Sequence, residues 1–154
     1  MSKQLRSMME EILISDILIP ADKVAHVQIG NSIEHALLVL TKSGYSMVPV
    51  LDLEYKLHGL ISSAMVLDSI FGLERVEFER LSSIKVEDVM NKDIPRLNLD
   101  SQFQNGLLTV IDNAFVCVEN SEGTFEGILT RREILKKINK EVRTYIYQSD
   151  INFI

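Results

Sequence analysis

A seven-residue phrase occurs twice in this chain and constrains its fold more than any other feature. The later copy, Gly-Ile-Leu-Thr-Arg-Arg-Glu, begins at Gly127, and an earlier version, Gly-Leu-Ile-Ser-Ser-Ala-Met, begins at Gly59. The two are 68 residues apart, and the rest of the chain falls into register around them. Self-similarity at a fixed spacing is the signature of a structural repeat, so the sequence predicts two copies of one unit of about 70 residues.

Each phrase has the pattern of a buried strand that runs directly into a helix. Thr130 followed three residues later by Glu133 fits a capping box, in which both side chains satisfy backbone N–H groups of the first helical turn. The alternative is that this helix N-terminus receives an anion, because free N–H groups and the helix dipole favour negative charge there. Arg131 and Arg132 favour the anion site, since cations in a first turn oppose the dipole unless a phosphate lies between them.

Hydrophobic periodicity predicts the order strand, helix, strand, strand, helix in each copy. In the first copy these elements cover residues 23–29, 33–43, 45–51, 57–61 and 63–71. In the second copy they cover residues 94–99, 103–112, 114–118, 125–129 and 131–147. Gly44 is expected to end the first of these helices in a left-handed conformation, and Asn113 is expected to take that place in the second copy.

We therefore expect an α+β protein whose two tandem repeats pack sheet to sheet, because one copy alone has too little core. The expected divisions are an N-terminal helix (1–14), a first repeat (15–71), a connector (72–84), a second repeat (85–140) and a final helix end and tail (141–154). The closing helix carries more apolar surface than one module covers, and we expect a homodimer to bury it. The residues expected in that contact are Ile134, Leu135, Ile138 and Ile146.

Composition excludes several classes of function. No apolar run approaches the roughly 20 residues of a membrane-spanning helix, and the first residues lack the apolar segment of a signal peptide. The net charge of −6 argues against general nucleic-acid binding, although a few local cations can still bind a small anion. The single cysteine, Cys117, excludes a disulfide within the chain and agrees with a reducing cytoplasm, where we expect the protein to work.

The sequence shows no catalytic or metal-binding set. The three histidines, His26, His35 and His58, have no metal-ligand spacing with a cysteine or with one another. Ser62 and Ser63 lack the Gly-x-Ser-x-Gly context of a nucleophilic serine. We therefore expect a protein that is not an enzyme and that holds no metal or cofactor.

The repeated order, with Met47-Val48-Pro49-Val50 in a central strand and Gly-hydrophobic-hydrophobic-Thr/Ser closing each copy, resembles a pair of CBS domains, a Bateman module. The resemblance covers about residues 10–140. More narrowly, the segments from Pro20 to Val27 and from Thr130 to Glu133 resemble the stand-alone cyclic-di-AMP-binding CBS proteins of Firmicutes, the DarB/CbpB group.

The resemblance implies a ligand site that combines segments of both copies. Its residues would be Lys23, Ala25, His26, Tyr45, Ser46, Met47, Val48, Thr130, Arg131 and Arg132. A second site would use Pro95, Arg96, Leu97, Ala114, Phe115, Val116, Ser62, Ser63 and Met65. Glu133 stands where the family places a ribose-binding Asp in the first site, and Met65, which accepts no strong hydrogen bond, stands there in the second. We expect the first site to bind ligand and the second to be empty or weak.

The same resemblance implies that the protein is a cytosolic cyclic-di-AMP receptor that acts as a homodimer. Its ligand-free form would bind target proteins, among them the guanosine-tetraphosphate synthetase of the stringent response, with pyruvate carboxylase as a second candidate, and ligand would release them. Two alternatives stay open, namely an energy sensor that binds AMP, ADP or ATP and a constitutive dimeric adaptor with vestigial nucleotide sites. Taken singly, Met47 and Val48 also fit a plain core, and Lys23 and His26 fit a solvated surface.

Overall fold

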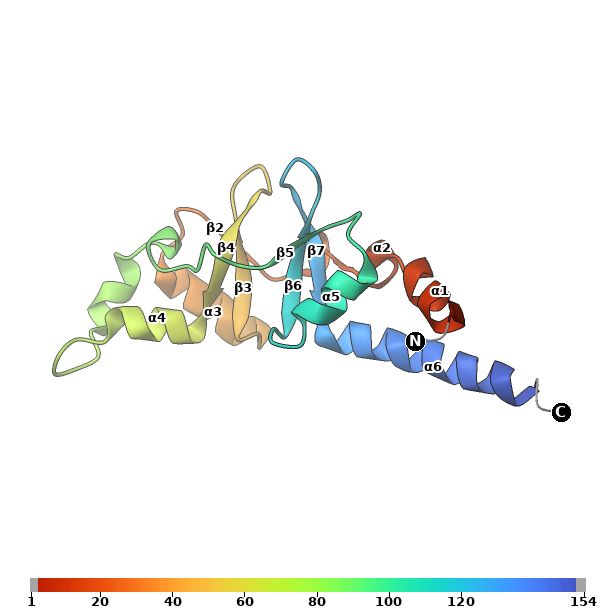
Figure 1. Ribbon diagram of the computed structural model, residues 1–154. Helices are drawn as coiled ribbons and strands as arrows, with labels where there is room; N and C mark the ends of the chain where they lie inside the picture. The colour runs from red at the N-terminus through yellow and green to blue at the C-terminus, as the bar shows by residue number, and fades with distance from the viewer. Residues whose placement is uncertain (1–2, 152–154) are drawn as a thin grey trace. The chain divides into compact units, whose positions relative to one another are not determined.

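The structure, a computed structural model, describes residues 3–151 (Figure 1). The ends of the predicted N-terminal segment and tail, residues 1–2 and 152–154, lie outside the described residues. The described chain forms two compact units: unit 1 contains residues 3–23, 95–120 and 126–151, and unit 2 contains residues 24–94 and 121–125. None of the helices within the described range is long and apolar enough to span a membrane.

Unit 2 is built on a three-stranded sheet in the order β2-β3-β4. Strand β2 (Val27–Gln28) is parallel to β3 (Met47–Leu51), and β3 is antiparallel to β4 (Leu57–Ser62). The helices of this unit are α3 (Ile33–Ser43), α4 (Ser63–Ile70), and the 3-10 helices η2 (Phe78–Ser82) and η3 (Val86–Asp88). This is the predicted strand–helix–strand–strand–helix order, followed by a connector with short helical turns.

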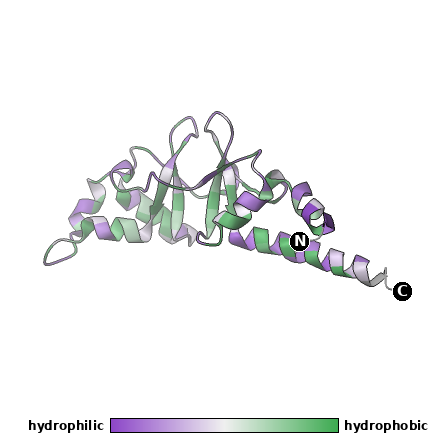
Figure 2. Ribbon diagram, in the orientation of Figure 1, coloured by the Kyte–Doolittle hydropathy of each residue, from purple (hydrophilic) through white to green (hydrophobic). Residues whose placement is uncertain are grey.

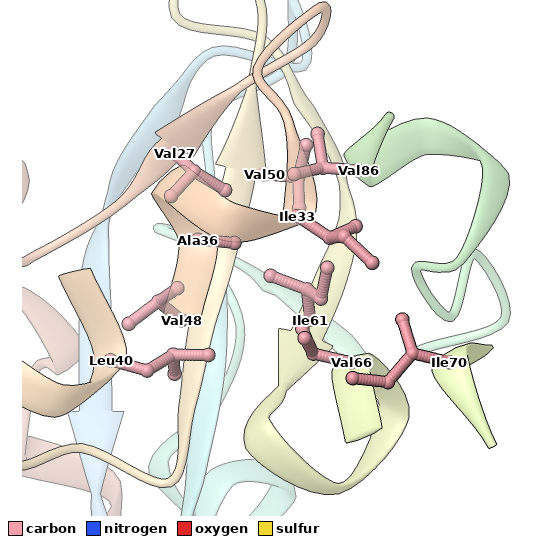
Figure 3. Packing of buried hydrophobic residues seen from close by; sticks show 10 residues of the cluster. All are labelled: Val27, Ile33, Ala36, Leu40, Val48, Val50, Ile61, Val66, Ile70 and Val86. Carbon is pink, nitrogen blue, oxygen red and sulfur yellow. The ribbon is translucent and has the colours of Figure 1, made fainter. Parts of the chain in front are cut away.

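The core of unit 2 lies between its sheet and its two α-helices. Figure 3 shows the side chains of α3 directed toward those of the strands, with α4 closing the cluster. The cluster consists of Val27, Ile33, Ala36, Leu40, Val48, Val50, Ile61, Val66, Ile70 and Val86. The three residues from α3 recur at helical spacing, which confirms the apolar face that the sequence predicted for this helix.

Unit 1 contains a four-stranded sheet in the order β1-β7-β6-β5. Its strands are β1 (Ile19–Pro20), β5 (Arg96–Asn98), β6 (Phe115–Glu119) and β7 (Phe125–Thr130). Its helices are α1 (Lys3–Glu11), α2 (Ile14–Ile17), η1 (Ala21–Lys23), α5 (Phe103–Thr109) and α6 (Arg131–Ile151). Figure 2 shows the central strands as hydrophobic and α6 as a mixture, in keeping with strands buried on both faces and a helix buried on one.

Each unit takes one sheet-edge segment from the other sequence repeat. In unit 1, Ile19 and Pro20 pair antiparallel with Ile128 and Gly127 of β7. In unit 2, the backbone of Asn91 exchanges two hydrogen bonds with Leu60 of β4, at 2.8 and 3.0 Å. Ile19 and Asn91 are 72 residues apart and occupy equivalent places in their repeats. The compact units are therefore assembled from parts of both repeats.

A glycine allows each of these close approaches. Gly127 has φ +149°, and a Cβ added there would collide with the backbone oxygen of Ile19. A Cβ added at Gly59 would lie 2.5 Å from the backbone oxygen of Asn91. The glycine that begins each copy of the repeated phrase therefore has a packing role, because only a residue without a side chain fits against the incoming backbone.

Some predicted element boundaries are wrong. The N-terminal helix, which was expected to reach residue 14, stops at Glu11, because Leu13 adopts an extended conformation before α2 begins. The strands expected over 23–29 and 94–99 shrink to β2 and β5. Before β2, the chain instead turns locally, with a 3-10 helix as far as Lys23.

The predicted helix ends have mixed outcomes. Gly44 ends α3 with φ +77°, and its N–H donates to the Leu40 oxygen, as expected. Asn113 does not end α5, since that helix stops at Thr109, and Asn113 instead donates from Nδ2 to the Thr109 oxygen at 2.9 Å. Ile134 is fully buried, so it is not available for the predicted dimer contact, whereas Ile138 is only partly buried against the core of unit 1.

Cys117 lies in β6 with no exposed surface. Burial raises the pKa of its thiol to about 12. The thiolate, which is the reactive form, is therefore not populated at neutral pH, and Cys117 has a packing role.

Replacing Gly127 by alanine should destabilise the protein more than replacing Gly44 by alanine. Gly44 also has a positive φ but has open space around its Cβ position, so it isolates the conformational cost of about 1–2 kcal/mol. Gly127→Ala adds a collision with the Ile19 backbone, and we expect a total loss of about 3 kcal/mol or more. Urea denaturation measures both, and equal losses in the two variants would contradict the close approach.

Candidate functional site

The first turns of α6 border an open groove in unit 1. Its volume is about 590 Å³, and its lining residues are Ala114, Thr130, Arg131, Arg132, Leu135, Lys136 and Asn139. Three residues of the predicted site, Thr130, Arg131 and Arg132, are thus brought together at one place. They lie where β7 ends and α6 begins without an intervening loop.

Thr130 caps α6. Its Oγ1 accepts a hydrogen bond from the backbone N–H of Glu133 at 3.1 Å, so the predicted capping bond is present. The N–H of Arg131 donates to the Ala114 oxygen at 2.9 Å, which ties the start of α6 to the residue before β6. Two backbone donors of the first turn are therefore satisfied within the protein.

The side chain of Arg131 points back to the end of α5. Its Nε donates to the Val110 oxygen at 2.8 Å, and its Nη2 donates to the Ile111 oxygen at 3.4 Å. Carbonyl groups at a helix C-terminus lack intrahelical donors, so this guanidinium closes α5. Arg131 therefore has a structural function whether or not it also contacts a ligand.

Arg132 and Lys136 are the cations that remain at the surface of the groove. Their side chains are 80% and 60% exposed. Both lie near the same carboxylate oxygen, Glu133 Oε1, at 3.8 Å from Arg132 Nη1 and 3.7 Å from Lys136 Nζ. Such exposed ion pairs contribute little to stability. Both cations therefore keep their charge available to an anion in the groove.

The predicted site residues of unit 2 lie at one end of its parallel strand pair. Ala25 and His26 precede β2, and Tyr45 and Ser46 precede β3. The register pairs Val27 with Val50, and extending it backward brings Ala25 level with Val48.

These residues differ in how much they expose. Tyr45 and Ser46 are exposed and Met47 is half-buried, whereas the side chain of Val48 belongs to the core. His26 is held locally, with Nδ1 3.1 Å from the Val24 oxygen and its ring edge-to-face with that of Tyr55 at 5.3 Å. Lys23, at the end of η1 in unit 1, is exposed.

Lys136 and Asn139 were not identified from the sequence. Both lie on the same helical face as Arg132, since residues three, four and seven positions apart share a face. Helical spacing is the signal that places them there, and both lie beyond the repeated phrase, which ends at Glu133. Among the residues that the structure describes, no cluster of His, Cys, Asp and Glu side chains could hold a metal ion.

The predicted second site has a different charge pattern. Ser62 caps α4, with Oγ accepting from the Met65 N–H at 3.1 Å, as Thr130 does for α6. Arg96, the cation expected there, has its Nη1 3.3 Å from Glu119 Oε2. A carboxylate therefore already lies beside this guanidinium.

Comparison with known proteins identifies the family. The CBS domain family matches residues 14–72 and 86–140. The chain is 58% identical over 134 residues to the cyclic di-AMP receptor B of Bacillus subtilis, covering 87% of this chain and 91% of that protein.

Solved structures give the same result. A CBS domain-containing protein from Bacillus anthracis is 60% identical, with a TM-score of 0.82 over 88% of this chain and 98% of that one. The CbpB protein of Listeria monocytogenes, solved in complex with c-di-AMP, is 54% identical, with a TM-score of 0.79 over 85% of this chain and 98% of that one. The predicted resemblance to CBS pairs and to the DarB/CbpB group is confirmed, and the chain belongs to the CBS domain family, with two CBS domains in tandem.

Proposed function

We propose that this protein is a cytosolic receptor for cyclic di-AMP that regulates other proteins by ligand-sensitive contact. The observation that carries the proposal is the groove beside α6, in which Arg132 and Lys136 are exposed and share one carboxylate. The choice of nucleotide is supported by the identity of 58% with the Bacillus subtilis cyclic di-AMP receptor B.

The ligand's two phosphates match the chemistry of this groove. Arginine offers planar, bidentate donors to a phosphate, and the α6 N-terminus adds a favourable dipole. We propose Lys23, Thr130, Arg131 and Arg132 as the polar contacts, with Arg131 contributing alongside its bonds to α5. The remaining proposed contacts, for an adenine base, are Ala25, His26, Tyr45, Ser46, Met47 and Val48.

Arg132→Met should lower the affinity for cyclic di-AMP roughly tenfold or more, because a lost charged hydrogen bond typically costs about 1.5–3 kcal/mol. Arg143→Met is the matched control, since it removes another exposed arginine from α6 outside the groove. Calorimetry with cyclic di-AMP, AMP, ADP and ATP measures affinity and ligand choice together. Tighter binding of a mononucleotide would favour the energy-sensor alternative, and equal losses in both variants would contradict the assignment of Arg132.

Homodimerisation is part of the same proposal. The apolar side chains that α6 leaves exposed are Leu135, Val142, Ile146 and Tyr147. A stable dimer buries on the order of 1,000 Å² or more of surface. The exposed apolar side chains of α6 can supply part of this area. Light scattering at micromolar concentration should give twice the chain mass of 17.5 kDa, and a species of 17.5 kDa alone would count against the dimer.

Ligand and target protein should be mutually antagonistic. We propose that the ligand-free form binds the stringent-response synthetase, with pyruvate carboxylase as a second target, through surfaces that include the cations of the groove. Two phosphates would neutralise those cations, so acidic partner residues would lose their contacts, and linkage makes the antagonism reciprocal.

A titration of the synthetase with and without saturating cyclic di-AMP measures this antagonism. We expect weaker binding of the synthetase in the presence of ligand. In Arg132→Met, far more ligand should be needed for the same release. Unchanged or stronger binding of the synthetase at saturating ligand would refute the proposed sign of regulation.

A further inference from the structure

We infer that Lys136 recognises the second phosphate of the ligand and so helps to select cyclic di-AMP over AMP. The inference rests on the proposed function, because it concerns the same groove. Lys136 lies outside the repeated seven-residue phrase, which ends at Glu133, so its role is an addition to the site predicted from the sequence.

The geometry of α6 places Lys136 beside Arg132. Residues four positions apart on a helix have Cβ atoms about 5–6 Å from one another. Both side chains line the groove and both are mostly exposed. A ligand lying along the first turns of α6 therefore meets two cations in succession.

Glu133 lies close to both cations. Its N–H is fixed by Thr130 Oγ1, and its carboxylate oxygen lies 3.8 Å from Arg132 and 3.7 Å from Lys136. One carboxylate cannot neutralise two cations, so the cluster of three side chains carries one net positive charge. A ligand with a single phosphate can be bound at Arg132, whereas a second phosphate that lies one turn further along α6 meets Lys136.

The first repeat provides an internal comparison. Its equivalents of Arg132, Glu133 and Lys136, 68 residues earlier, are Ala64, Met65 and Asp68. These three side chains together carry one net negative charge, so this position repels an anion.

The backbone at the two positions is nevertheless alike. The caps are equivalent, at 3.1 Å in both repeats, and the N–H of Ser63 donates to the Ser46 oxygen at 3.2 Å as that of Arg131 donates to Ala114. The same strand-to-helix turn therefore forms without Arg132 and Lys136. The two cations are therefore not needed to form this turn, which agrees with a role in ligand binding.

Lys136→Met tests the inference, with Lys140→Met as the matched control. Lys140 is an exposed lysine one turn further along α6 and does not line the groove. Calorimetric titrations with cyclic di-AMP and with AMP should be made at one fixed ionic strength. Lys136→Met should weaken cyclic di-AMP binding roughly tenfold, leave AMP binding within about twofold, and keep the wild-type melting temperature. Lys136→Arg, which keeps the positive charge, should restore most of the affinity.

The outcomes separate the inference from the proposed function. No binding of cyclic di-AMP to the wild-type protein would overturn the proposed function and this inference with it. If the wild type binds, an effect of Lys136→Met no larger than that of Lys140→Met overturns the inference alone. An equal loss for cyclic di-AMP and AMP also overturns it, because Lys136 would then contact a group that both ligands share. If AMP binding is too weak to measure, the affinities of Lys136→Met and Lys140→Met for cyclic di-AMP decide whether the inference holds.

Discussion

The close approach of two backbones at Gly127 and at Gly59 is the constraint on which the rest of the structure depends. At Gly127 the incoming segment of the first repeat forms β1 beside β7, and at Gly59 the incoming segment of the second repeat pairs with β4 through Asn91. Any side chain at these two positions would occupy the space of the incoming carbonyl group. Each compact unit therefore needs residues from both repeats, which explains why the unit of about 70 residues occurs in tandem.

The same strand that pairs with the incoming segment leads directly into the candidate site. Three residues after Gly127, β7 ends at Thr130, and α6 begins at once. The short connection leaves little freedom in where Arg131 and Arg132 lie. The two arginines differ in their contacts. Arg131 donates hydrogen bonds to the Val110 and Ile111 oxygens at the end of α5, whereas Arg132 lines the open groove.

Much of this arrangement could be predicted from local sequence patterns. The order of elements follows from hydrophobic periodicity, and Gly44 and Thr130 mark a helix end and a helix start by chemistry that acts within four residues. Periodicity could not say which face of α6 is covered, so Ile134 was expected at a dimer contact although it lies in the core. The end of α1 at Glu11 could not be predicted either, because no Pro or Gly directly follows it in the sequence.

At the candidate site, too, local sequence patterns do not reveal contacts between residues far apart in the chain. Arg131 was grouped with Arg132 because both follow Thr130, yet its hydrogen-bond acceptors lie 20 and 21 residues earlier, where no local pattern reveals them. Lys136 was missed for the opposite reason. Its place beside Arg132 follows from helical spacing, but Lys136 lies three residues beyond the end of the repeated phrase.

A crystal structure of the protein with cyclic di-AMP would show directly whether α6 binds the phosphates of the ligand. We expect one ligand per chain, with one phosphate within hydrogen-bond distance of Arg132 and the other within reach of Lys136. We expect no ligand at the start of α4, where Ala64 and Asp68 replace these cations. A ligand whose phosphates lie away from α6, or one bound equally at α4, would contradict the proposed site.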